Sequence, residues 1–176
     1  MKQFFISVIA AIMATMNVHA QGEWKNEVSI AYGGGANTDI VMSIAKGMFT
    51  GKQLNYWGPV SVEYFYRPLE RLGVGAVAAI SGSKWDDEAN AKSTYFTVLP
   101  AVKYNWLNKS HFSMYTKVAA GLTVSSDSGT RSDETRVMFN WQGSLIGLEF
   151  GGAFRGFAEL GLGEQGIILG GLRYKF

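Results

Sequence analysis

The sequence predicts an all-β fold, a closed antiparallel barrel of about eight strands. Three observations predict it. Apolar and polar residues alternate with a period of two along most of the chain, which is the period of a β-strand. The connections between the alternating segments are in turn short and long, and the long ones are polar. The last alternating segment ends the chain on an aromatic residue, Phe176.

The N-terminus has the features of a secretory signal. A run of apolar residues over 4–14 follows Lys2, and Val18-His19-Ala20 fits the small-x-small pattern of a cleavage site. A membrane anchor is the alternative, but the run is shorter than the ~20 residues that a spanning helix needs. We therefore expect a cleaved signal peptide over residues 1–20 and one barrel domain over residues 21–176.

The composition excludes several classes of protein. The chain has no cysteine, so neither a disulfide framework nor a thiolate metal site can form. Its 16 basic and 14 acidic residues give a net charge of +2, which is no footprint for nucleic acid. Nothing after the signal approaches the ~18 apolar residues of a membrane helix. An exported chain of this kind needs a closed fold or the membrane for its stability.

The first three strands are expected over about residues 24–33, 56–67 and 72–82, with a tight turn over 68–71. Their apolar faces are those of Trp24, Val28, Ile30 and Tyr32, then Val60, Val62, Tyr64 and Tyr66, then Leu72, Val74, Ala76, Ala78 and Ile80. The opposite faces carry Lys25, Glu27, Ser29 and Ala31, then Ser61, Glu63, Phe65 and Arg67, then Gly73, Gly75, Val77 and Ala79.

The fourth and fifth strands are expected over about residues 93–106 and 111–123, after a polar loop over 83–90. Their apolar faces are those of Phe96, Val98, Val102, Tyr104 and Trp106, then Phe112, Met114, Val118, Ala120 and Leu122. A short turn over 107–110 joins them. Pro100 lies inside the fourth strand and has no N–H for the ladder, so we expect a bulge there.

The last three strands follow a polar loop over residues 125–134. The sixth begins near Arg136, and its pattern blurs at residues 146–148, where the register stays open. Before that point Phe139, Trp141 and Leu145 lie opposite Asn140, Gln142 and Ser144. The seventh and eighth strands are expected over about residues 153–162 and 166–176, with a short link at Gly163-Glu164-Gln165.

The first long connection is expected to contain a short helix over Asp39–Phe49. Its apolar residues Ile40, Val41, Ile44, Ala45, Met48 and Phe49 share one helical face. Thr38 or Asp39 is a suitable N-cap. An extra strand here would give an odd number of strands and place the two termini at opposite ends of the barrel.

The distribution of charge predicts that lipid surrounds the barrel. Backbone groups find no water in hydrocarbon, so a sheet in a membrane must close on itself, with apolar residues outside and polar residues permitted inside. A soluble barrel has the reverse arrangement. Aromatic residues gather near both ends of the expected strands, as two interfacial girdles would require, although aromatics also favour strands in general. The two groups are Trp24, Tyr64, Tyr66, Tyr104, Trp106, Phe112 and Tyr174, and Tyr32, Tyr56, Trp57, Tyr95 and Phe96.

The same alternation turns seven charged side chains inward: Glu27, Glu63, Lys103, Lys117, Arg155, Glu159 and Arg173. Unpaired charges in the interior are costly, so we expect opposite signs to pair and fill the lumen. The small inward residues Gly73, Gly75 and Ala79 leave room for them. A hydrated pore lined by unpaired charges is the competing interpretation, and it would need a wider barrel.

The C-terminal segment Gly170-Gly171-Leu172-Arg173-Tyr174-Lys175-Phe176 resembles the last strand of outer-membrane barrels. The stretches 157–163 and 71–75 also look like small OmpA/OmpX-like barrels. The resemblance covers the mature chain and implies a Gram-negative outer-membrane location, surrounding outer-membrane lipid and insertion by the barrel-insertion machinery. It makes Leu172, Tyr174 and Phe176 the assembly signal. The anchoring role of a peptidoglycan-binding domain is not carried over.

Function is less defined by the sequence. Because eight strands enclose a side-chain-filled lumen, we expect a monomeric structural or surface-interaction protein that acts through its extracellular loops. A porin-like channel or carrier for apolar molecules is the alternative. A lipid-modifying enzyme is third, because His111 and Ser113, the one Ser/His pair, fall at a periplasmic turn. We expect no catalytic, cofactor or metal site. The acids at residues 86–88 and at 127, 133 and 134 fit no EF-hand spacing, and residues 33–35 are no phosphate loop.

Overall fold

The computed structural model describes residues 24–36, 54–85, 92–128 and 134–176. The expected signal peptide over residues 1–20 and the expected helix over Asp39–Phe49 lie outside the described residues, as do the acids at 86–88 and 133. Within the described part of the chain, no helix is long and apolar enough to cross a membrane.

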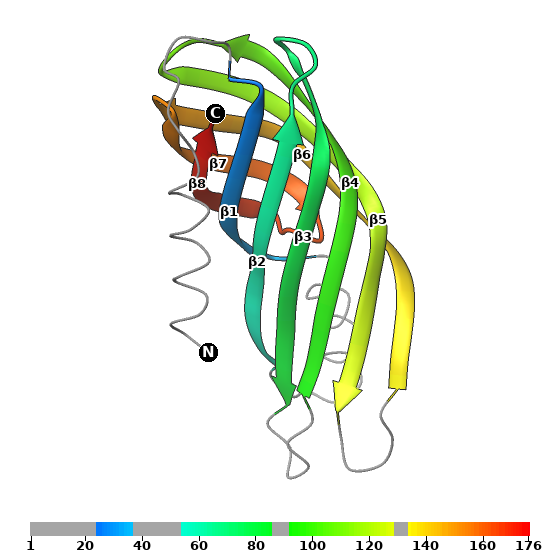
Figure 1. Cartoon of the computed structure of the whole chain (residues 1–176). Coiled ribbons are helices and arrows are strands. Elements are labelled where there is room, and N and C mark those ends of the chain that lie inside the picture. Colours follow the sequence, from blue (N-terminus) through cyan, green and yellow to red (C-terminus); the bar gives the residue numbers. More distant parts are fainter. Residues whose placement is uncertain (1–23, 37–53, 86–91, 129–133) are drawn as a thin grey trace, which may run out of the picture.

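Eight antiparallel strands form a closed barrel, as the alternation predicts (Figure 1). They are β1 (Asn26–Gly34), β2 (Leu54–Tyr66), β3 (Leu72–Trp85), β4 (Lys92–Asn108), β5 (Phe112–Ser128), β6 (Glu134–Gly151), β7 (Phe154–Gly163) and β8 (Ile168–Lys175). Each strand pairs with its neighbours in sequence, and β1 pairs with β8 to close the sheet. The backbone groups of Asn26 and Phe176 exchange two hydrogen bonds of 2.8 and 2.9 Å at this seam.

The two ends of the barrel differ. At one end, which we call the turn end, residues 67–71, 109–111 and 152–153 join successive strands, and the C-terminus lies beside them (Figure 1, top). At the opposite end, the loop end, the strands lead to residues 37–53, 86–91 and 129–133. The turns and the even number of strands therefore place Asn26 and Phe176 together at the turn end.

The wall of the barrel is longer on one side. β2 to β6 continue toward the loop end past the turn that joins β7 to β8, as Figure 1 shows. β6 pairs with β7 only over Gln142–Gly151, although β6 begins at Glu134. The β7–β8 turn thus lies partway along the barrel, and its residues Glu164, Gln165 and Gly166 are buried.

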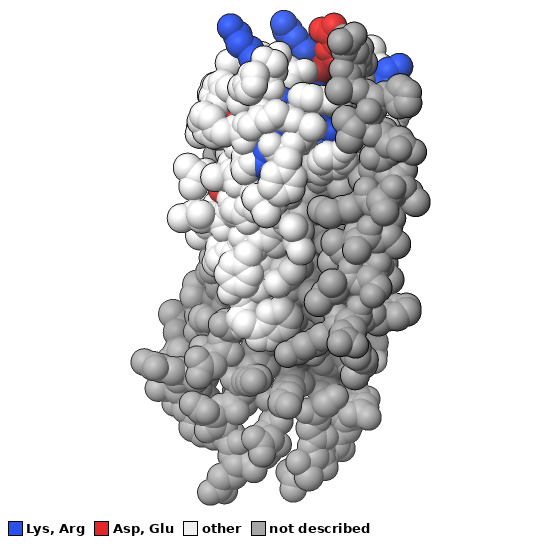
Figure 2. All heavy atoms as spheres, turned by 60° about the vertical axis from the view of Figure 1, so that its left-hand side comes forward, with Lys and Arg blue, Asp and Glu red and all other residues white. Residues whose placement is uncertain are grey.

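Side chains alternate between the lumen and the outer surface in the phase that the sequence predicts. Val62 is 50% exposed, whereas its neighbour Glu63 is fully buried. The outer wall is apolar: Phe139 and Leu145 on β6 are 69% and 67% exposed. Figure 2 shows a largely uncharged surface on one face, where the visible Lys and Arg gather toward the turn end. Buried polar residues inside and exposed apolar residues outside invert the pattern of a water-soluble barrel.

Two expectations about local structure are wrong. The register continues through Pro100 without a shift, and the irregularity of β4 lies between Asn105 and Leu107 instead. The ring of Pro100 faces outward beside Gly121, whose lack of a side chain gives the proline space, so the missing N–H requires no extra residue. Tyr95 is 3% exposed and does not belong to an outer girdle.

The strand ends also differ from expectation. β3, β4 and β5 run further into the polar segments, to Trp85, Asn108 and Ser128. Ladder hydrogen bonds extend the strands there although the sequence has lost its apolar alternation. Trp24 and Lys25 precede β1 rather than lie in it.

Candidate functional site

All seven charged residues that the sequence places in the lumen lie there, and each is 2% exposed or less. They come from six strands: Glu27 from β1, Glu63 from β2, Lys103 from β4, Lys117 from β5, Arg155 and Glu159 from β7, and Arg173 from β8. The period of two directs them inward, and closure of the sheet brings them together across the barrel axis.

Glu63 has the most varied set of partners. Lys117 Nζ lies 2.5 Å from its Oε1, and Arg173 Nη2 lies 2.7 Å from its Oε2. Ser29 Oγ donates to Oε2 at 2.9 Å, and Gln165 Nε2 donates to Oε1 at 2.9 Å. Both oxygens of this fully buried carboxylate therefore accept from cationic and neutral donors of four different elements.

Glu159 accepts a second group of hydrogen bonds beside Glu63. Tyr115 donates its hydroxyl to Oε1 at 2.5 Å, and Ser144 donates to Oε2 at 2.5 Å. Lys117 Nζ lies 2.8 Å from Oε2, so this lysine bridges Glu159 and Glu63. A lysine held between two carboxylates fixes β2, β5 and β7 relative to one another.

Glu149 on β6 is a centre of the network that the sequence interpretation missed. Lys103 and Lys175 each place Nζ 2.5 Å from one of its carboxylate oxygens. Arg173 Nη1 also pairs with Glu149, so the two guanidinium nitrogens of Arg173 join Glu149 to Glu63. β6 has a register shift between Ser144 and Ile146, which reverses the phase and turns Glu149 inward. This is the strand whose register the sequence left open.

Three further lumen residues were not in the predicted network. Lys175 follows Arg173 by two residues, so the strand period already contained a signal for it. Arg67 was assigned to the inward face, and its Nη2 lies 3.7 Å from Glu27. Gln165 lies in the β7–β8 turn, where no strand period applies. Its side-chain Nε2 donates to Ser61 Oγ and to Glu63 Oε1, and its backbone N–H donates to Gln142 Oε1.

Aromatic rings complete the filling of the lumen. Lys103 Nζ lies 4.1 Å from the centre of the Tyr115 ring, and the guanidinium of Arg173 lies 4.2 Å from that of Phe157. On the wall formed by β2 to β5, Phe65, Val77, Leu99, Ala101 and Ala119 form a buried apolar cluster. The charged network and these apolar side chains therefore share the lumen, and both draw residues from β2, β4 and β5.

The structure does not form the Ser/His pair considered from the sequence. His111 is exposed at the turn end and contacts Ser110 Oγ through Nδ1 at 3.1 Å. Ser113 is buried, donates to Asn108 and accepts from Arg155 Nη1 at 2.8 Å. The described residues include no group of three His, Cys, Asp or Glu side chains arranged to hold a metal ion.

The C-terminal residues Leu172, Tyr174 and Phe176 lie on the outer side of β8 or just after it. Leu172 is 49% and Phe176 39% exposed. The rings of Tyr174 and Phe176 stack with centroids 5.8 Å apart. This arrangement presents a continuous apolar edge beside the seam between β1 and β8.

Comparison with known proteins gives structural similarity only. No protein-family model and no curated protein matches the chain. The chain is similar to Ail, the attachment invasion locus protein of Yersinia pestis, with 17% identity over 86% of this chain and 97% of Ail and a TM-score of 0.49. A second Ail structure, in complex with the heparin analogue sucrose octasulfate, gives 13% identity over 86% and 97% of the two chains and a TM-score of 0.48. The N-terminal beta-barrel domain of Pseudomonas aeruginosa OprF gives 13% identity over 89% of this chain and all of that domain, with a TM-score of 0.46.

Proposed function

We propose that this chain is an integral outer-membrane barrel whose lumen is closed by its charge network and which acts as a structural or surface-interaction scaffold. The observation that carries the proposal is the inversion of polarity across the wall. Glu63, Lys117 and Arg173 are fully buried, while Val62, Val118 and Leu172 beside them are 49–60% exposed. An outer face of exposed apolar side chains is unfavourable in water, whereas it suits the hydrocarbon of a membrane.

The filled lumen supports a scaffold rather than a channel. Eight strands enclose an interior only wide enough for side chains. The ion pairs of Glu63, Glu149 and Glu159 cross this interior from β2, β6 and β7 to cations of β4, β5 and β8. The buried β7–β8 turn adds Gln165 on the loop-end side of the network. In this proposal the barrel is not an enzyme, and the connections at the loop end supply the surface for an extracellular partner.

Recording in planar lipid bilayers tests the closed lumen. The mature barrel, refolded in detergent and shown to be folded by heat-modifiable migration in electrophoresis, is expected to insert without steps of conductance. A general porin in the same bilayers is the positive control. A liposome swelling assay with small sugars should likewise show no uptake above that of empty liposomes. Regular ohmic steps from the folded barrel would contradict the closed lumen and favour the porin-like alternative.

A further inference from the structure

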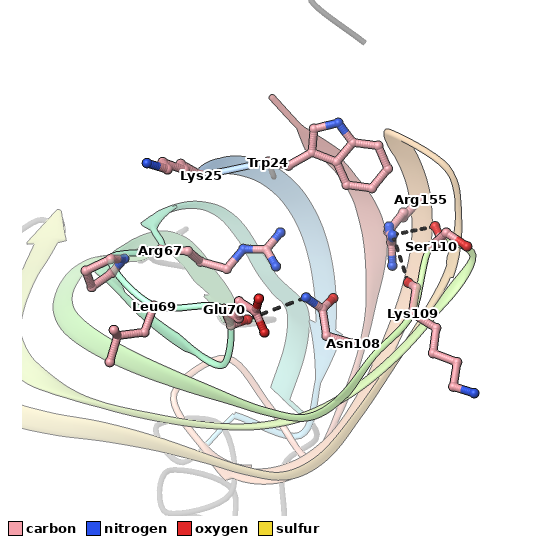
Figure 3. A pocket seen from close by; sticks show the side chains of 10 residues that line it. Trp24, Lys25, Arg67, Leu69, Glu70, Asn108, Lys109, Ser110 and Arg155 are labelled. Atoms are coloured by element: carbon pink, nitrogen blue, oxygen red, sulfur yellow. Dashed lines mark hydrogen bonds between the residues drawn. The ribbon is translucent and has the colours of Figure 1, made fainter. Parts of the chain in front are cut away.

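The turn end of the barrel contains a cavity of about 440 Å³ at the edge of the charge network (Figure 3). It is lined by residues that precede β1, by the β2–β3 and β4–β5 turns, and by β7. The lining includes two buried arginines, Arg67 and Arg155, together with Trp24 and Asn108. A volume of this size is typical of sites for small ligands.

Arg67 offers hydrogen-bond donors to this cavity. The residue is 6% exposed, and its Nε has no hydrogen-bond partner among the described residues. Its nearest carboxylate is that of Glu27, 3.7 Å from Nη2, which is beyond hydrogen-bond length. In Figure 3 the guanidinium of Arg67 points across the cavity toward the side-chain amide of Asn108. A buried N–H without an acceptor is costly, so an acceptor in the cavity would stabilise this arrangement.

Arg155 supplies positive charge rather than free donors. Its Nε, Nη1 and Nη2 donate to Gly152 O, Ser113 Oγ and Ser110 O at 2.7–2.8 Å. These acceptors are neutral, and the nearest carboxylate oxygen, on Glu149, is 3.7 Å away. Glu149 is already held at 2.5 Å by Lys103 and Lys175. The charge of Arg155 at the edge of the cavity is therefore only weakly compensated.

The network as a whole also contains more buried basic side chains than buried carboxylates. Six buried basic side chains, of Arg67, Lys103, Lys117, Arg155, Arg173 and Lys175, share the four carboxylates of Glu27, Glu63, Glu149 and Glu159, while Glu164, a fifth buried carboxylate, accepts from Asn140. The two whose only carboxylate contacts are as long as 3.7 Å are Arg67 and Arg155, and both face the cavity. Excess positive charge around a cleft attracts an anion.

We propose that this cavity binds a phosphate-type oxyanion, borne by a small organic molecule or by a lipid headgroup. Arginine suits such an ion because its planar fork donates two parallel N–H groups. Arg67 and the second N–H of the Asn108 amide, whose Nδ2 also donates to Glu70 O at 3.4 Å, donate to the oxygens, Arg155 supplies the positive charge, and the organic part lies against Trp24 and Leu69. The ring of Trp24 lies 5.3 Å from the guanidinium of Arg155, which fixes that wall of the site.

Glu70 is the one acid among the residues that line the cavity. It is exposed, and no ion pair within 4 Å joins it to a described Lys or Arg. Its carboxylate would repel a bound anion. Glu70→Gln should therefore tighten phosphate binding, which is the opposite of the effect of losing an arginine.

The test uses the refolded mature barrel in zwitterionic detergent, with inorganic phosphate as the probe and the Arg Nε–Hε signals in ¹⁵N NMR spectra as the readout. Phosphate should shift the Arg67 signal saturably. Arg67→Gln should weaken binding, followed at Arg155, about tenfold, the value of one charge-assisted hydrogen bond. Arg71→Gln is the matched control, because Arg71 is exposed in the same turn and does not line the cavity.

A second arm distinguishes the source of the ion. The barrel is placed in phosphatidylcholine bilayers with and without phosphatidylglycerol. A shift of Arg67 with phosphate supports a soluble ligand, and a shift only with phosphatidylglycerol supports a lipid headgroup. No shift in either arm would overturn the proposal. Equal weakening by Arg71→Gln and Arg67→Gln would overturn it as well, because binding would then reflect general surface charge. Since Arg67 can also support folding, Glu70→Gln gives an independent reading: unchanged or weaker binding would count against the site.

Discussion

Glu63 shows how a single residue can unite the barrel, because its carboxylate contacts side chains of β1, β5, β8 and the β7–β8 turn. Glu63→Ala would leave Lys117 and Arg173 buried with one carboxylate fewer. Loss of one partner from a buried ion pair costs about 3–5 kcal/mol, so we expect a loss of stability of that order. Unfolding in urea, followed by heat-modifiable migration, measures it.

The control for this substitution is Glu70→Ala, which removes an exposed glutamate from a turn and should leave the unfolding midpoint unchanged. In planar bilayers Glu63→Ala should also show small conductance steps that the wild type lacks. A variant as stable and as silent as the wild type would show that the network does not hold the lumen closed.

A substitution at Gly147, in the barrel wall on β6, tests how tightly the side chains of the network are packed. A Cβ at this position would lie 2.3–2.7 Å from the Tyr115 ring, whose hydroxyl is hydrogen-bonded to Glu159. Gly147→Ala should therefore displace the ring and destabilise the barrel by about 1–3 kcal/mol, the usual cost of overpacking. Gly156→Ala is the control, since a Cβ there meets no atom within 4 Å. Equal unfolding midpoints for the two variants would contradict the tight packing of Tyr115.

At the scale of the strand, the sequence predicted which face is turned inward wherever the period of two is unbroken. Glu63 and Lys117 were placed correctly for this reason, and the predicted strand order followed from the alternation of short and long connections. No face was predicted for Glu149, because the extra residue in β6 near Leu145 reverses the phase and left the register open. Counted back from the turn end, the alternation Leu148-Glu149-Phe150 does indicate that Glu149 faces the lumen.

Features that depend on other strands could not be predicted in this way. Gln165 enters the lumen because β7 and β8 are shorter than β2 to β6, and no local pattern records that difference. Pro100 keeps its register because Gly121 on the neighbouring strand leaves space for its ring. Both outcomes are set by the partner strand and not by the segment itself.

The C-terminal strand β8 carries the proposed assembly signal. Phe176→Ala removes an exposed ring that stacks on Tyr174 beside the closing seam. If this edge is what the insertion machinery recognises, the variant should reach the periplasm and be processed but accumulate less folded barrel in the outer membrane. Quantitative electrophoresis of membrane fractions, with and without heating, measures the folded amount.

Phe154→Ala is the matched control for the terminal residue. Phe154 is 53% exposed on β7 and pairs with Tyr174. The substitution therefore removes an outer aromatic ring near the same end of the barrel without changing the terminal residue. Folded amounts that fall equally in both variants would show that loss of interfacial aromatic surface, and not the terminal position, is responsible.

At the scale of the whole molecule, the apolar outer wall and the two unlike ends set the orientation in a membrane. The chain has no cysteine, so one introduced thiol reports on one position. Ser126 is exposed near the loop end of β5, and Lys109 is exposed in the β4–β5 turn at the opposite end. Short turns on the periplasmic side and longer connections outside are the general arrangement of outer-membrane barrels. A membrane-impermeant maleimide added to intact cells should therefore label Ser126→Cys but not Lys109→Cys. After the outer membrane is permeabilised, both should react, and denatured protein gives the maximum labelling. The reverse labelling on intact cells would show that the orientation is inverted. The cavity around Arg67 would then lie at the cell surface, where extracellular anions rather than periplasmic ones would reach it.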